Sequence, residues 1–381
     1  MTGDPDAPLN GTQVAITDQD LSERQREILT AIIEEFIATA EPIGSRTLTK
    51  SRSLDLSPAT VRNAMADLEE QGLLAAPHAQ AGRIPTVAAF RFYVERLAQR
   101  GRITSREREL IQAITQGQPG EGRDLAGILR EAGRVLSTVS RHAALVLMPP
   151  LEEVIFQHIE FLPVREKTVL GVFVAKSGLV QHRLIEVTFP LDRDELTRMS
   201  NYLSSVLGGR TLAEVRAGIL REMADERTQA DQMMRHALYL GQRTIQPIEH
   251  EVMLEGERNI LEQPEFADIE KMRKLLRAFE EKTLLLRLLD AAAHNPIGAQ
   301  AAASAETSVV LGSETSLRDL KDLAAVTATY AGDEGPAGRV GIIGPTRMDY
   351  ARVIPLVELT AEALTQTLSS EPTPRSGTEK E

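Results

Sequence analysis

The sequence predicts an α+β protein of several domains that begins with a winged helix-turn-helix. Two observations carry this prediction. Between Ile43 and Thr86 the pattern runs in the order of short helix, turn, capped helix and basic hairpin. From Leu125 onward, helical stripes alternate with strand-like apolar runs, and an α+β sheet domain split by a helical insertion is the simplest account of them.

The composition is that of a globular protein. The 381 residues are 42% hydrophobic and 26% charged, which is enough for two or three domains with their own cores. No run of 18 apolar residues occurs, and the acidic N-terminus lacks the basic and apolar regions of a secretory signal, so we expect a cytoplasmic location. The absence of cysteine excludes disulfides, thiolate metal sites and a cysteine nucleophile.

The net charge of -12 argues at first sight against nucleic acid as a partner, but the charges are unevenly distributed. Residues 43–66 contain four basic residues and one acidic residue, and residues 78–102 contain five and one. Positive potential is therefore concentrated in the helix-turn-helix and hairpin, and this local sign matters for docking to a duplex.

The first two helices have clear boundaries. Ser22 and Gln25 form a capping box that starts a helix, which we expect to run to Ala40 because a residue before proline leaves the α region and Glu41-Pro42 follows. Gly44-Ser45 then opens a short helix that reaches about Ser51.

The third helix has the strongest start signal. Ser57 can accept a hydrogen bond from a free backbone N–H, and Pro58 suits the first helical position. Gln71-Gly72 is a stop signal. The expected buried stripe consists of Val61, Ala64, Met65 and Leu68.

A hairpin and a further helix complete the first domain. We expect short strands at 73–74 and 83–84 around a loop of small and polar residues, closed by Pro85. A helix over 87–100 then carries Phe90, Tyr93, Val94 and Leu97 inward and leaves its arginines outside.

The remainder of the chain alternates between helical and strand-like patterns. A capping box of Thr104 and Glu107 opens a connecting helix, and a helical stripe begins at Leu125. A long helix over 264–293 and a closing helix over 350–368 are expected. We expect strands at 143–148, 154–162, 168–175 and 179–187, a helical region over 192–245, and strands at 309–311, 326–330 and 339–343 that complete the earlier sheet.

Seven residues are candidates for contact with DNA. Arg62 and Asn63 could read base edges from the third helix, since arginine pairs well with guanine and asparagine with adenine. Hydroxyls at helix starts suit phosphate contact, and Arg83 could reach the backbone or the minor groove. The candidates are Ser45, Arg46, Ser57, Thr60, Arg62, Asn63 and Arg83.

Other interpretations of these features stay open. The helical trio could be a small domain that binds protein or serves as a hinge, and each candidate side chain could simply be solvated. The seven histidines show no metal-ligand spacing, and the glycines at 338, 341 and 344 are not a dinucleotide fingerprint. No paired catalytic residues support an enzyme, and no cofactor is expected.

Several separated motifs resemble the HrcA family of heat-inducible transcription repressors. They lie in the family's order and extend over nearly the whole chain between the tails. The similar stretches are Glu41-Pro42-Ile43-Gly44-Ser45, Leu56-Ser57-Pro58-Ala59-Thr60-Val61-Arg62-Asn63, Gly82-Arg83-Ile84-Pro85-Thr86, Gly256-Glu257-Arg258-Asn259-Ile260-Leu261 and Gly341-Ile342-Ile343-Gly344-Pro345-Thr346-Arg347-Met348-Asp349-Tyr350. The wing tip Ala79-Gln80-Ala81 departs from the family's more hydroxyl-rich pattern.

The resemblance implies a domain organisation. It implies a winged-helix DNA-binding domain over 18–103, a GAF-like α/β domain over 104–195 and 262–368, and a mainly helical inserted dimerisation domain over 196–261. Residues 1–17 and 369–381, which are polar and rich in small residues, are expected to be disordered tails.

The resemblance also implies a function. A homodimer would bind CIRCE, an inverted-repeat operator upstream of chaperone genes, would depend on the GroEL chaperonin to remain active, and would lose repression on heating. The alternative is a winged-helix regulator that senses a small molecule through the GAF-like domain, although no set of convergent polar groups for such a ligand can be placed from the sequence.

Overall fold

The structure is a computed structural model of the whole chain. It describes residues 21–51, 56–78, 81–97, 101–114, 125–148, 155–176, 180–189, 192–224, 232–245, 252–293, 306–332 and 335–369. The expected tails, apart from Ser369, and wing-tip residues 79 and 80 lie outside these ranges. The chain divides into two compact units, residues 1–99 and 100–381.

The first unit contains the expected three helices, α1 (Glu23–Thr39), α2 (Ser45–Ser51) and α3 (Pro58–Glu70). Both predicted caps are confirmed. The Ser22 backbone N–H donates to Gln25 Oε1 at 2.9 Å, and the Thr60 backbone N–H donates to Ser57 Oγ at 3.1 Å. The predicted stripe of α3 is its buried side, so the three helices share one apolar core.

The hairpin is present, shifted by one residue from the expected strands. β1 (Leu74–Ala75) pairs antiparallel with β2 (Ile84–Pro85), and Ile43 and Arg83 form a further antiparallel bridge. Helix α4 (Val87–Phe92) continues as the π-helical segment η2 (Tyr93–Leu97), in which Tyr93 and Val94 are buried as expected. This arrangement confirms the winged helix-turn-helix.

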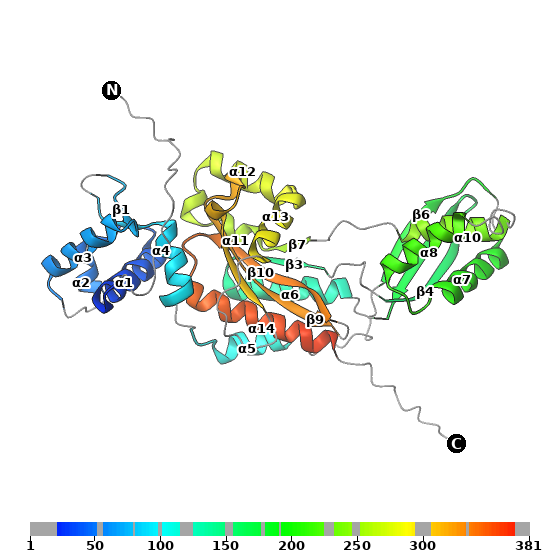
Figure 1. The fold of residues 1–381 in the computed structure, drawn as a ribbon, viewed down its shortest axis with the longest axis horizontal. Helices are drawn as coiled ribbons and strands as arrows, with labels where there is room; N and C mark the ends of the chain where they lie inside the picture. The colour runs from blue at the N-terminus through cyan, green and yellow to red at the C-terminus, as the bar shows by residue number, and fades with distance from the viewer. Residues whose placement is uncertain are drawn as a thin grey trace, which may run out of the picture. The chain divides into compact units, whose positions relative to one another are not determined.

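A five-stranded antiparallel sheet forms the centre of the second unit (Figure 1). Its strand order is β7-β3-β10-β9-β8. The strands are β3 (Ala143–Leu147), β7 (Val252–Glu255), β8 (Thr307–Leu311), β9 (Leu323–Gly332) and β10 (Gly335–Pro345). Helices cover both faces, which gives three layers. The designation GAF-like stays a prediction.

The two helical layers come from different parts of the chain (Figure 1). α6 (Leu125–Ser140) and α14 (Tyr350–Leu368) pack on one face, and α5 (Ser105–Gln112) packs against both. On the other face lie α11 (Glu257–Leu261), α12 (Ile269–Glu280) and α13 (Lys282–Ala293), whose leucines share a core with Ala143, Leu145 and Ile343. The short helices η4 (Pro264–Phe266), η5 (Gly312–Glu314) and η6 (Arg318–Leu320) lie in the connections.

The expectation that all strands build one sheet is wrong. β4 (Phe156–Arg165), β5 (Thr168–Ala175) and β6 (Val180–Glu186) form a separate three-stranded antiparallel sheet. α7 (Arg193–Leu207) and α10 (Gln232–Thr244) pack on this sheet, and α8 (Leu212–Ala224) packs on α10. We propose limits of about 155–245 for the inserted module, in place of 196–261.

The two sheets differ in burial pattern. β3 is buried at four successive positions because helices cover both faces of its sheet, whereas β5 alternates between buried and half-buried side chains. A strand covered on both sides has a continuous apolar sequence, and a strand covered on one side alternates. Ala143-Ala144-Leu145-Val146-Leu147 has the first pattern, but the run Val169 to Ala175 of β5 is equally apolar, so the difference in burial is visible in the structure and not in the sequence.

The expected long helix over 264–293 is also wrong. The structure has η4, then α12 capped by Asp268, and a break at Glu281, where α13 takes over. Glu281 has φ -85° and ψ 81°, outside the helical region. The break lets Leu275 of α12 and Leu285 of α13 both face the sheet core, whereas on one straight helix these two side chains would point about 80° apart.

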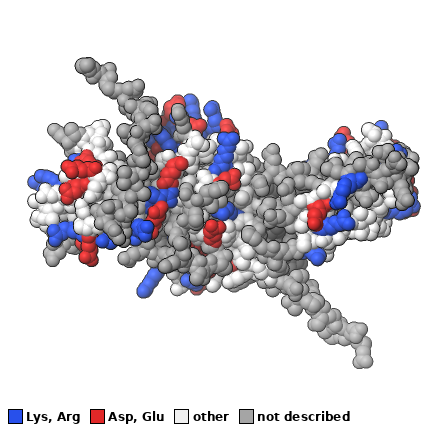
Figure 2. Space-filling model, viewed as in Figure 1, with Lys and Arg blue, Asp and Glu red and all other residues white. Residues whose placement is uncertain are grey.

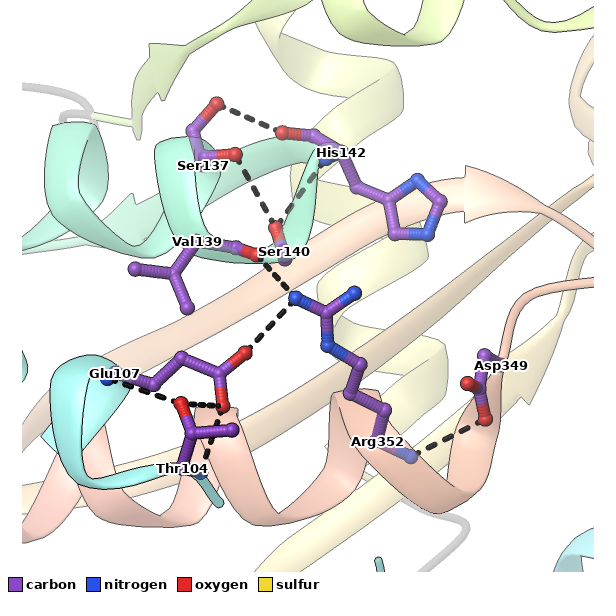
Figure 3. Close-up of polar contacts among 8 residues, drawn as sticks. All are labelled: Thr104, Glu107, Ser137, Val139, Ser140, His142, Asp349 and Arg352. Carbon is purple, nitrogen blue, oxygen red and sulfur yellow. Dashed lines mark hydrogen bonds and ion pairs between the residues drawn. The ribbon is translucent and has the colours of Figure 1, made fainter. Parts of the chain in front are cut away.

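A half-buried histidine, His142, immediately precedes β3. The Ser137 hydroxyl donates to the His142 carbonyl at 2.7 Å, while His142 Nδ1 is buried without a hydrogen-bond partner (Figure 3). Burial, together with the positive charges of Arg347 and Arg352, lowers the pKa of His142 to about 4.

The lowered pKa of His142 predicts that acid reduces the stability of the folded chain. Between pH 6.5 and 4 the unfolded chain holds a proton on His142 that the folded chain does not, so stability falls as the pH falls through this window. We expect His142→Gln to remove on the order of 2 kcal/mol of the stability difference between pH 7 and pH 5. Urea titration of both proteins at both pH values measures it, and an equal pH dependence in the two would contradict the prediction.

Candidate nucleic-acid interface

Helix α3 has one buried side and one exposed side within the first unit. Val61, Ala64 and Met65 are buried, whereas Arg62 and Asn63 are exposed. Both exposed side chains lie in the first half of the helix, and residues in that half of a recognition helix reach base edges in the major groove. The structure thus places the two expected base readers side by side on an open surface.

The start of α3 combines two hydroxyls. Ser57 Oγ and Thr60 Oγ1 lie 2.9 Å apart, and Ser57 Oγ accepts from the Thr60 backbone N–H. Ser57 is exposed and Thr60 is half-buried. These hydroxyls stabilise the helix start, where free backbone N–H groups and the helix dipole favour an anion such as a phosphate.

Charge is distributed unevenly along α3. Arg62 lies near its start, and Asp67, Glu69 and Glu70 lie in its last turn. A duplex attracts the first half of the helix and repels the last turn, which fixes the polarity with which α3 can approach DNA. Figure 2 accordingly shows both signs of charge over this unit rather than a uniformly basic surface.

Helix α2 packs against α3 and contributes exposed basic residues. Arg46 and Lys50 are exposed, but Ser45 is buried, with 9% of its surface accessible. The serine is therefore placed to fit against the core rather than to contact a phosphate. Lys50 was counted in the sequence only as part of the positive charge, and its exposure beside Arg46 makes it a further phosphate candidate.

Arg83 is held by neighbours rather than extended from the hairpin. Its Nε donates to Glu69 Oε2 at 2.8 Å, and its Nη1 donates to the Ala81 carbonyl at 3.3 Å. The side chain is 29% exposed. The carboxylate of Glu69, at the end of α3, was missed as the partner because residues 14 positions apart show no local pattern.

The base of the wing, which is the β1–β2 hairpin, is fixed by close backbone contacts. The Ile43 and Arg83 backbones exchange two hydrogen bonds of 2.9 Å, and a Cβ on Gly82 would lie 2.5 Å from the Ile43 backbone. The Thr86 hydroxyl donates to the Gly72 carbonyl at 2.7 Å. The Gly82-to-Thr86 motif thus attaches the wing to the helices.

Comparison with known proteins identifies both units. Residues 20–96 match the family described as "Winged helix-turn-helix transcription repressor, HrcA DNA-binding", and residues 126–354 match "HrcA protein C terminal domain". A crystal structure of a hypothetical protein shares the fold, with a TM-score of 0.59 and 23% sequence identity over 92% of this chain and 99% of that one.

Relatives from several bacteria match almost end to end. The Heat-inducible transcription repressor HrcA of Geobacter sulfurreducens is 45% identical over 92% of this chain and 99% of its own length. That of Sorangium cellulosum is 41% identical over 91% and 98%.

The residues that the structure describes contain no helix with the length and apolarity needed to span a membrane, and no group of three His, Asp or Glu side chains placed to hold a metal ion. The profile matches and the near-complete relatives agree on one assignment: the chain belongs to the HrcA family, which consists of transcription repressors rather than enzymes.

Proposed function

We propose that the chain is a sequence-specific DNA-binding repressor of heat-shock operons that acts in the cytoplasm on an inverted-repeat operator of the CIRCE type. The observation that carries this proposal is the capped helix α3, which exposes Arg62 and Asn63 opposite a fully buried stripe. Family membership favours this function over small-molecule sensing.

The candidate residues take three roles in this proposal. Arg62 and Asn63 read bases, and Arg46, Ser57 and Thr60 contact phosphates near the helix starts. Arg83 remains a candidate for the DNA backbone once Glu69 releases it, while Ser45 acts through the packing of α2. The assignments of these seven residues rest on exposure or burial, position and charge.

Replacement of Asn63 tests the base-reading role. Asn63→Ala should cost about 1–3 kcal/mol on the operator and little on unrelated DNA of the same length, because only base contacts distinguish the two duplexes. Fluorescence anisotropy with both duplexes at one fixed salt concentration measures this. Gln71→Ala removes an exposed amide at the far end of α3 and should change neither affinity. Equal losses of Asn63→Ala on both duplexes would refute the role.

We also propose that the repressor is a homodimer, because a two-fold protein matches a two-fold operator. The support lies on the outer face of the β4-β5-β6 sheet. α7 and α10 pack on the side that buries Phe161, Phe173 and Ile185, whereas Leu162, Val164, Val180 and Leu184 are exposed.

Apolar side chains lie on this face at two levels, and the row between them consists of Val172 flanked by Glu160 and His182. Leu162 pairs with Leu170, which pairs with Leu184, and Val174 pairs with Val180, so the side chains follow one another across all three strands. A group of exposed apolar side chains on a sheet face marks an interaction surface. A second copy of the same face fits it by symmetry.

Charge on this face should separate the protomers. Leu184 is 62% exposed, so Leu184→Glu should leave the fold intact, yield a monomer, and weaken operator binding by about 100-fold or more through lost avidity. Light scattering and operator titration measure both effects. Ile269→Glu is the matched control, since Ile269 is 61% exposed on α12 outside the inserted module. A Leu184→Glu protein that stays dimeric would contradict the proposal.

The heat response completes the proposed function. The relatives are described as heat-inducible repressors, and we propose that the GroEL chaperonin maintains the folded fraction of this chain. Folded proteins are marginally stable, so a mild temperature step raises the non-native fraction, and chaperonin occupied by other clients cannot restore it.

Operator occupancy through a heat step tests this mechanism. After a brief mild heat step and return to low temperature, we expect occupancy to recover with added chaperonin and ATP and to stay reduced without them, because unfolded chains associate before they refold. Excess unfolded client protein should block the recovery. Occupancy that survives heating unchanged, whether chaperonin is present or absent, would contradict the mechanism.

A further inference from the structure

The first helix of the second unit, α5, is held against helices α14 and α6 by a charged contact. Arg352 of α14 donates from Nη2 to Glu107 Oε1 of α5 at 2.8 Å and to the Val139 carbonyl at the end of α6 at 3.0 Å (Figure 3). Glu107 also accepts from the Thr104 backbone N–H and hydroxyl, both at 2.8 Å. The Glu107 carboxylate thus caps α5 and binds Arg352 of α14, and Arg352 in turn binds the end of α6.

Further contacts hold the same segment. The Gly101 backbone N–H donates to the Ala351 carbonyl at 2.8 Å, and a Cβ on Gly101 would lie 3.0 Å from that oxygen. Ile111 and Ile114 are fully or nearly buried. The side chain of Glu107 is 16% exposed, so its bond to Arg352 is partly shielded from water.

These contacts shorten the covalent connection between the two units. The winged-helix unit is described up to Leu97, and the fastened segment begins at Gly101. Four Cα steps span at most about 14 Å. If α5 were released, the connection would instead run to Leu125, the first residue of α6, and a flexible chain of that length has a root-mean-square span of about 30 Å.

We propose that Arg352 and Glu107 are positioning residues that set which half-site spacings the dimeric repressor accepts. The inference rests on the proposed function, because it requires a dimer on an inverted repeat. In the proposed dimer, a short connection on each protomer limits how far apart the two winged-helix units, here called the readers, can lie and how far they can rotate. A longer connection on each side would let the readers reach half-sites at other separations.

The connection sets the effective concentration of the second winged-helix unit at the second half-site once the first unit is bound. Binding of the second reader is intramolecular and gains affinity only if the connection can span the sites, a gain of 10²–10⁴ for well-matched geometry. Insertion of five base pairs between half-sites turns one half-site to the opposite face of the duplex, since a helical turn is about 10 base pairs. On this DNA, winged-helix units on short connections lose the affinity gained from binding both half-sites. Units on longer connections keep part of that affinity.

The experiment compares operator affinity at the natural half-site spacing and with five base pairs inserted. For the wild-type dimer we expect a loss of about 100-fold or more on insertion. For Glu107→Arg and for Arg352→Ala, which leave Ile111 and Ile114 in place, we expect a loss smaller than that of the wild type by about 3-fold or more, together with faster hydrogen exchange over residues 101–114. Light scattering confirms that both variants are dimers.

Glu131→Arg is the matched control. Glu131 forms an ion pair of 2.7 Å with Arg134, and this pair lies entirely within α6. The control makes the same charge change, which by itself strengthens binding to any DNA, and it should keep the wild-type dependence on spacing.

The outcomes separate the two proposals. Variants that retain the wild-type spacing dependence, whether or not exchange over 101–114 becomes faster, overturn the assignment of Arg352 and Glu107. A wild-type protein that binds no inverted repeat in preference to unrelated DNA overturns the proposed function itself.

Discussion

The pairing of β3 with β7 is the constraint on which the organisation of the second unit depends. Leu147 lies opposite Val252 and Ala144 opposite Glu255, so the chain leaves the sheet and returns to it at neighbouring positions. Facing residues of an antiparallel pair have Cα atoms about 5 Å apart. The intervening hundred residues can therefore fold as a module without disturbing the central sheet, and β4, β5 and β6 pair with one another instead.

Polar contacts on either side of this pairing give a role to residues in the motifs 256–261 and 341–350, to which the sequence assigned no chemistry. Asn259 Nδ2 donates to Ser137 Oγ at 3.0 Å and to the His142 carbonyl at 3.3 Å, which ties the residues after β7 to those before β3. Arg347, which follows β10, donates to Gln263 and Glu265. Asn259 and Arg347 thus brace the returning chain, so both side chains have a structural role.

Local signals were sufficient for the helices of the first unit. The caps at Ser22 and Ser57, the stripe of α3 and the stop at Gly72 each depend on residues within one or two turns, and all are confirmed. Pairing between distant segments was not readable in the same way. The Arg83–Glu69 contact, the bridge from Ile43 to the wing and the separation into two sheets depend on which distant elements meet, and a strand's sequence does not show its partner.

The strength of a single reader explains why the attachment of the readers matters. Two good base contacts discriminate by about 1–3 kcal/mol each, and the acidic last turn of α3 and the overall charge of -12 limit non-specific attraction to DNA. In the function proposed above, one winged-helix unit alone is selective but binds weakly. Specific repression by the proposed dimer then requires both winged-helix units to bind together, so the connection that carries each unit matters as much as its contacts with DNA. The covalent connection from the winged-helix unit leads into α5, which is held on the second unit by contacts that include Glu107, Arg352 and the two buried isoleucines.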